Sequence, residues 1–131
     1  PENVVRAAAM GYNTFDAVIP TRDARHKRLY VACDDFASLT WKAEGFYANL
    51  YIEDAKYACD RRPVEESCDC LCCRDYSRAY LRHLFDVRDA LALRLATIHN
   101  LRFYTRLMSR LRQILEEDQH GEESGHDDGR R

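Results

Sequence analysis

The chain has 131 residues, enough for one compact domain or for part of a larger protein. Its formal net charge of −2 is unevenly divided, because residues 116–131 carry seven acidic and two basic side chains and the remainder is therefore positive. No apolar run is long enough for a membrane span or a secretory signal, so we expect a cytoplasmic protein without membrane association.

The first 28 residues contain a helix start, a short apolar run and a basic segment. Proline and glutamate ahead of Val-Val-Arg-Ala-Ala-Ala predict a helix that stops at Gly11. Residues 15–20 predict a strand, and residues 21–28 a basic loop. Asp16 lies inside the apolar run. It is either a turn residue at the end of the strand or a catalytic carboxylate presented at the carboxyl end of a barrel strand.

Residues 29–67 interleave aromatic side chains with small and charged ones. This composition favours short antiparallel strands, in a β-rich connecting segment. The aromatic residues are typical of core or hairpin packing rather than of a platform on which bases stack.

Four cysteines crowd into the run from Cys68 to Cys73, and a histidine follows at position 99. Three thiolates and one imidazole are the donors of a closed tetrahedral zinc site. Disulfides between cysteines this close would be strained, which also favours a metal. Cys72 competes with Cys73 as a ligand, and spacing alone does not choose between them. Cys33 and Cys59 stand apart and are read as small apolar residues.

Two helices are expected after the cysteine run, in a zinc-binding helical subdomain over residues 68–115. Apolar residues at steps of three and four predict one amphipathic helix over Tyr76–Leu95 and a continuation from Ile98 to Leu115. The many arginines form a solvated face, or some of them meet phosphate. Residues 116–131 are acidic and predict a disordered tail.

Four motifs follow one another along the chain: Gly11-x-x-x-Phe15-Asp16-x-Val18-x-Pro20-Thr21-Arg22-x-Ala24-Arg25, Cys68-x-Cys70-x-x-Cys73, Ser77-Arg78-Ala79-Tyr80-Leu81-Arg82-His83-Leu84 and Thr97-x-His99-Asn100-Leu101. In this order they resemble the C-terminal portion of the queuine-type tRNA-guanine transglycosylases. The resemblance covers residues 1 to about 113, apart from the middle zone.

The resemblance implies an α/β fold, the C-terminal part of a (β/α)8 TIM barrel with a zinc-binding insertion and C-terminal helices. Residues 1–28 would be the end of the catalytic barrel. Such pentosyltransferases exchange the wobble guanine of tRNAs with a GUN anticodon (for Asp, Asn, His and Tyr) for a 7-deazaguanine base, preQ1 or queuine, in queuosine modification. A homodimer with the zinc region near its interface is also implied.

The resemblance further assigns roles to individual residues. Asp16 matches the nucleophile that attacks C1′ of the ribose and forms a covalent enzyme–RNA intermediate. The remaining matches are a wobble-nucleotide segment (Thr21, Arg22, Asp23, Ala24 and Arg25), the end of an upstream RNA-contacting loop (Pro1, Glu2 and Asn3) and the ligands of one structural Zn²⁺ (Cys68, Cys70, Cys73 and His99).

The chain also departs from the family pattern. The family loop usually continues with Asn-Gly, whereas His26-Lys27 follow here, and Asp23 stands where Asn is common. The stretch 33–51 has no counterpart, and the first two thirds of the barrel, with a second catalytic aspartate, is missing. We therefore expect no activity without that part. The alternatives are a non-catalytic zinc-stapled tRNA-binding module and a degenerate partner subunit.

Overall fold

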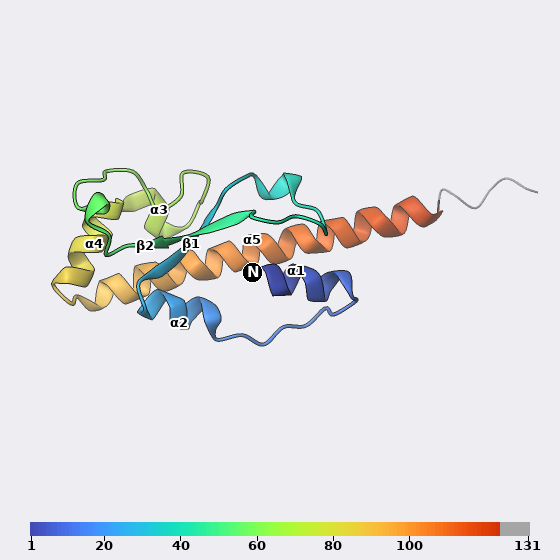
Figure 1. Cartoon of the computed structure of the whole chain (residues 1–131), viewed down its shortest axis with the longest axis horizontal. Helices are drawn as coiled ribbons and strands as arrows, with labels where there is room; N and C mark the ends of the chain where they lie inside the picture. Colours follow the sequence, from blue (N-terminus) through green and yellow to red (C-terminus); the bar gives the residue numbers. More distant parts are fainter. Residues whose placement is uncertain (124–131) are drawn as a thin grey trace, which may run out of the picture.

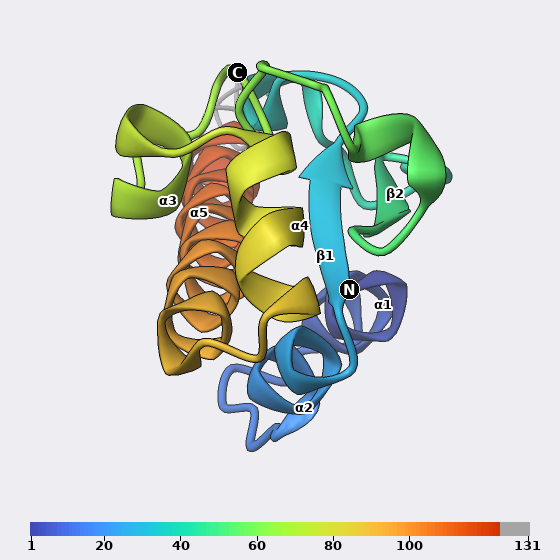
Figure 2. The same cartoon turned by 90° about the vertical axis from the view of Figure 1, so that its left-hand side faces the viewer.

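The computed structural model describes residues 1–123, and the side chains of residues 1–120. One long helix, α5, runs along the long axis of the molecule. Helices α1 and α2 lie along one side of it, and a two-stranded hairpin with α3 and α4 lies along the other (Figures 1 and 2). The elements are α1 (Glu2–Ala9), α2 (Ile19–Arg25), β1 (Arg28–Ala32), β2 (Tyr47–Tyr51), α3 (Leu71–Asp75), α4 (Arg78–Asp86) and α5 (Ala90–Glu123), with short 3₁₀ turns η1 (Phe36–Ser38) and η2 (Ala55–Tyr57).

Helix α5 contributes to both hydrophobic cores of the molecule. Its buried residues recur at steps of three and four, so they line one face of the helix. The stripe consists of Ala92, Leu95, Ala96, His99, Asn100, Phe103, Leu107, Leu111 and Ile114. The first half of the stripe joins a core with β2, α4 and the cysteine run. The second half joins another core with α1, η1 and Phe46.

The predicted disordered tail is wrong at its beginning, because α5 continues to Glu123. Extending an existing helix costs far less than nucleating one, and glutamate is a good helix former. Side chains also anchor this end: the Trp41 indole N–H donates to Asp118 over 2.7 Å, and Arg110 pairs with Glu117 at 2.9 Å. The rest of the predicted tail, residues 124–131, lies outside the described residues.

The single helix predicted over residues 76–95 is interrupted. Helix α4 ends at Asp86 and α5 begins at Ala90. Between them Arg88 has a positive φ of 57°, which reverses the chain, and the Asp89 carboxylate accepts the Leu91 N–H over 2.8 Å. The segments before and after this break both carry apolar residues at helical spacing, so the sequence pattern alone does not reveal the break.

Antiparallel strands in the middle zone are confirmed. Strands β1 and β2 pair from Arg28↔Tyr51 to Ala32↔Tyr47. Residues 33–46 form a long excursion between them, which we call the hairpin excursion. It buries Phe36, Leu39 and Phe46 in the core around the second half of α5, so Phe36 and Phe46 serve packing.

The predicted strand over residues 15–20 is wrong for this chain. Residues 12–18 have no regular structure, and α2 begins at Ile19, so the predicted basic loop is largely helical. A strand needs neighbours to satisfy its backbone hydrogen bonds, and the only sheet in residues 1–123 is the β1–β2 pair. The segment is instead left with an exposed carboxylate at Asp16 and an exposed Val18.

None of the helices within residues 1–123 combines the length and the apolar character that a membrane span requires.

Lys27 adopts the left-handed conformation, with φ of 62°, at the turn between α2 and β1. This is the position at which the resembling family usually has glycine, the residue that tolerates such a φ without a steric cost.

We predict that Lys27→Gly is more stable than Lys27→Ala by about 1 kcal/mol, because alanine keeps the Cβ that disfavours a positive φ. Both variants lose the ion pair with Glu53 equally. Chemical denaturation of the two proteins measures the difference. The same pair of substitutions at the exposed helical Ser109 serves as the control, and there alanine should be favoured by a similar amount.

Candidate metal centre

The four residues expected to bind zinc come together in the structure. The ligand atoms of Cys68, Cys70, Cys73 and His99 all lie within 4.8 Å of one another, and all four residues are buried. The cysteines come from the end of the loop that leads into α3 and from α3 itself, and the histidine comes from the buried stripe of α5. The cluster therefore joins the loop to the long helix.

The cysteine run folds around the site because of its own backbone. Cys70 is the N-cap of α3, with an extended conformation, and its Sγ accepts the N–H of Cys73 over 3.4 Å. A hydrogen bond from a backbone amide stabilises the thiolate form of the sulfur. The short helix then turns Cys73 back toward the same point.

The orientation of His99 selects the ring nitrogen that faces the sulfurs. Its Nε2–H donates to the Tyr30 carbonyl over 2.6 Å. Because a carbonyl only accepts, the proton resides on Nε2 and the lone pair on Nδ1. Nδ1 lies 3.3 Å from Cys73 Sγ and 3.7 Å from Cys70 Sγ, so the lone pair is directed into the cluster as a metal ligand requires.

The positions of the sulfurs decide between Cys72 and Cys73, because the Cys73 sulfur lies in the cluster and the Cys72 sulfur does not. Hydrogen bonds from the Cys68 and Cys73 thiols lower the pKa of Cys70 to about 3. Hydrogen bonds with Cys68 and Cys70 raise the pKa of Cys73. Burial raises the pKa of Cys72 to about 12, and its sulfur is not in the cluster, so it remains a neutral thiol in the core. Three soft sulfur donors and one imidazole, closed from water, fit a structural zinc ion.

A surface ion pair adds a second link between the cysteine run and α5. Asp69, between two of the ligands, forms a two-pronged pair with Arg102 at 2.6 and 2.8 Å. Hydrogen bonds from Arg102 lower the pKa of Asp69. The sequence pattern does not predict this pair, although an acid inside a cysteine motif and the arginines of a later helix are a signal for it.

The residues expected to contact RNA divide between two faces of α2. Thr21 is partly exposed and its hydroxyl donates to the Val18 carbonyl over 3.0 Å, while Arg22 and Arg25 are exposed. Asp23 and Ala24 are buried. Pro1 is the N-cap of α1, and Glu2 and Asn3 are exposed residues of its first turn. Asp16 lies apart from the cluster, in the irregular segment before α2.

Asp23 faces the interior and has partners there. Its carboxylate accepts hydrogen bonds from the Tyr30 hydroxyl and from Arg28. Burial would raise its pKa, but the hydrogen bonds from Tyr30 and Arg28 outweigh burial and lower it. The charge expected beside RNA is thus compensated within the domain, where it ties α2 to β1.

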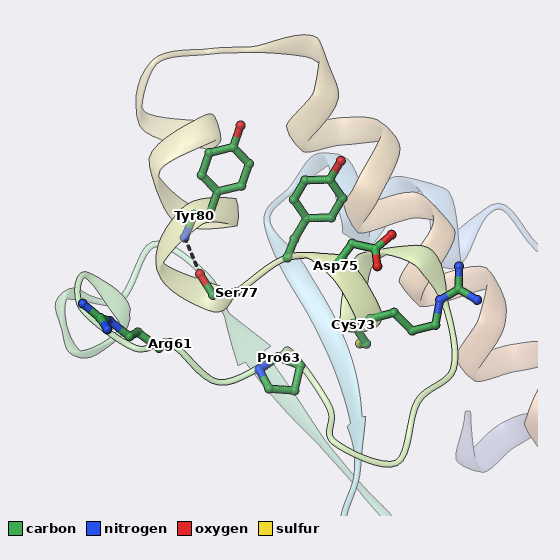
Figure 3. Close-up of a pocket in the computed structure, with 8 residues that line it drawn as sticks. Arg61, Pro63, Cys73, Asp75, Ser77 and Tyr80 are labelled. Carbon is green, nitrogen blue, oxygen red and sulfur yellow. Dashed lines mark hydrogen bonds between the residues drawn. The ribbon is translucent and has the colours of Figure 1, made fainter.

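Beside the metal centre the surface has a hollow of about 520 Å³ (Figure 3). The rings of Tyr76 and Tyr80 stack next to it, with centroids 5.6 Å apart and an interplanar angle of 12°. Ser77 caps α4 by accepting the Tyr80 N–H over 3.2 Å, which holds the second ring in place. Tyr80 is 44% exposed, whereas Tyr76 is half-buried against the core, so the Tyr80 ring is the part of this pair that faces solvent.

The neighbouring cysteines offer a matched test of the metal centre. We predict about one zinc ion per chain in the purified protein and in Cys72→Ala, but none in Cys73→Ala, because only the second change removes a ligand. Elemental analysis measures the metal. Chelation should release the cysteine run and unfold the short helix α3, because the metal would no longer hold them to α5. Zinc retained by Cys73→Ala would remove that residue from the ligand set.

Comparisons with known proteins agree with the geometry. Residues 1–124 match the family model described as queuine tRNA-ribosyltransferase. The chain is 41% identical over 118 residues to a queuine tRNA-ribosyltransferase of Thermoanaerobacter pseudethanolicus, and these residues are 90% of this chain and 28% of the relative. It is 41% identical over 116 residues to that of Syntrophobacter fumaroxidans, which covers 88% of this chain and 27% of the relative. The chain thus spans little more than a quarter of the relatives' length. It belongs to the queuine tRNA-ribosyltransferase family.

Proposed function

We propose that this chain is the C-terminal part of a tRNA-guanine transglycosylase, which exchanges the wobble guanine of GUN-anticodon tRNAs for preQ1 or queuine. The observation that carries the proposal is that a carboxylate, Asp16, is exposed three residues before the helix that presents Thr21, Arg22 and Arg25. The family match over residues 1–124 supports it.

The proposed chemistry uses two displacements at one carbon. An oxygen of Asp16 attacks C1′ of the ribose, the glycosidic bond breaks, and guanine leaves with the electron pair and takes up a proton. The incoming base then loses its proton and attacks C1′, and the carboxylate leaves. Splitting one displacement into two easier ones is the logic of retaining glycosidases. The acid that protonates guanine belongs to the part of the enzyme outside this chain.

The same part supplies the sheet that residues 12–18 lack. Val18 is 64% exposed and Ile19 is also exposed. Exposed apolar residues are expected here if this segment packs against the upstream part of the protein. We place residues 1–28 at the end of a (β/α)8 barrel, so that Asp16 takes up its position at a strand end when the upstream strands are present. The exposed cations of Arg22 and Arg25 then meet the RNA backbone.

The proposal extends to one zinc per chain, a cytoplasmic location and a homodimer. None of the six cysteines forms a disulfide, which fits a reducing compartment. The dimer is supported by the exposed ring of Tyr80, which stacks on Tyr76 beside the metal centre, because aromatic side chains are enriched in protein interfaces.

A non-catalytic tRNA-binding module is the alternative. An exposed carboxylate beside cations weakens the attraction to phosphate, so a module that only binds gains nothing from Asp16. Its presence favours the enzyme.

Asp16→Asn tests the two functions against each other. In the full-length protein we expect the rate of labelled-guanine exchange into tRNA to fall by about a thousandfold or more, because the amide is a poor nucleophile. The covalent protein–tRNA adduct on a denaturing gel should disappear as well, while tRNA binding persists. Asp34→Asn, at another exposed aspartate, is the control. Undiminished exchange in Asp16→Asn would exclude this residue as the nucleophile.

The dimer has its own test. We predict that Tyr80→Asp converts the full-length protein to a monomer in sedimentation velocity, because a buried carboxylate facing its own copy is costly. Leu101→Asp, at an exposed position of α5, should leave the dimer intact. A monomeric wild-type protein, or an unchanged sedimentation coefficient in Tyr80→Asp, would contradict this interface.

A further inference from the structure

Asn100 is fully buried, and no role in the metal centre or in the proposed reaction accounts for it. It follows the metal ligand His99 on α5. Burying an amide is costly unless its polar atoms find partners, and here both the oxygen and the nitrogen do.

Its partners belong to the segment that carries α2. Nδ2 donates to the Pro20 carbonyl over 3.1 Å and to the Arg28 carbonyl over 3.0 Å. Pro20 lies in the first turn of α2 and Arg28 lies just beyond its end. One amide nitrogen therefore binds both the first turn of α2 and the first residue of the strand that follows it.

Asn100 and the metal ligand His99 bind the same residue of β1. Asn100 Oδ1 accepts the Tyr30 N–H over 3.2 Å, and His99 Nε2 donates to the Tyr30 carbonyl over 2.6 Å. Consecutive residues of α5 thus hold both polar groups of one β1 residue. Any rotation of α5 that released His99 from the thiolates would also draw Asn100 away from its partners.

We propose that Asn100 is a positioning residue through which the metal centre sets the placement of α2. Zinc fixes the His99 ring, the ring fixes α5 against Tyr30, and Asn100 transmits that alignment to Pro20 and Arg28. Asp23 supports the link from within α2 through Arg28 and the Tyr30 hydroxyl. The ligand set is that of a structural metal site, yet occupancy of the site would determine the position of α2, the helix that presents Arg22 and Arg25.

Hydrogen–deuterium exchange of the full-length, zinc-loaded protein tests this placement. In Asn100→Ala we expect amides of residues 19–28 to exchange about tenfold faster or more, because the anchoring bonds are lost. Amides of residues 103–115 should be unchanged, and zinc content should stay at about one per chain. Asn49→Ala, at an exposed position, should change neither region. Ile114→Ala, in the other core, should affect residues 103–115 instead.

The link to the metal is tested by combining the variant with chelation. In wild type, removing zinc should speed exchange in residues 19–28, and in Asn100→Ala it should add little, because the connection is already cut. Chelation that leaves residues 19–28 unchanged in wild type overturns the proposal even if the variant fails to fold. Equal acceleration by chelation in both proteins overturns it too.

A kinetic consequence follows, and it alone rests on the proposed function. Asn100→Ala should raise KM for tRNA about tenfold while kcat changes much less, since α2 is misplaced but Asp16 is retained. Asp16→Asn shows the opposite split. If no guanine exchange is found in any variant, the transglycosylase proposal fails, and the deuterium-exchange result still decides the role of Asn100.

Discussion

The hydrogen bond from the His99 imidazole to the Tyr30 carbonyl is the interaction on which the rest of the structure depends. It places the ring proton on Nε2 and leaves Nδ1 to face the sulfurs. It also locks α5 against β1 at the junction of the two cores. This one polar contact within an apolar stripe therefore both orients the metal ligand and fixes how α5 packs on β1.

Much of the metal centre was predictable, because donor types and spacing are properties of the sequence. The choice of Cys73 over Cys72 was open on spacing alone and followed from the resemblance. The structure explains it, since α3 points one sulfur into the cluster and the other into the core. The role of Asn100 was not predictable, because its partners lie 70 to 80 residues away along the chain.

The spacing of apolar residues did not predict secondary structure correctly where contacts with distant segments determine it. The apolar run around Asp16 reads as a strand, but a strand exists only with a partner, and among the described residues none is offered. Conversely, the acidic end of α5 reads as disordered, yet it is carried on a helix nucleated elsewhere and is held by Trp41. Asp23 was expected beside RNA, and its burial depends on Arg28 and Tyr30, which only the folded hairpin brings to it.

The hairpin excursion of residues 33–46 constrains which residues of α5 can change in related chains that share it. Its Phe36, Leu39 and Phe46 cover Phe103 and Leu107 of α5. A homologue that shortened the excursion would leave those helix positions open to water, so the deletion would be tolerated only alongside polar replacements on α5. Loop length and helix composition, far apart in the gene, should therefore be inherited as a linked pair.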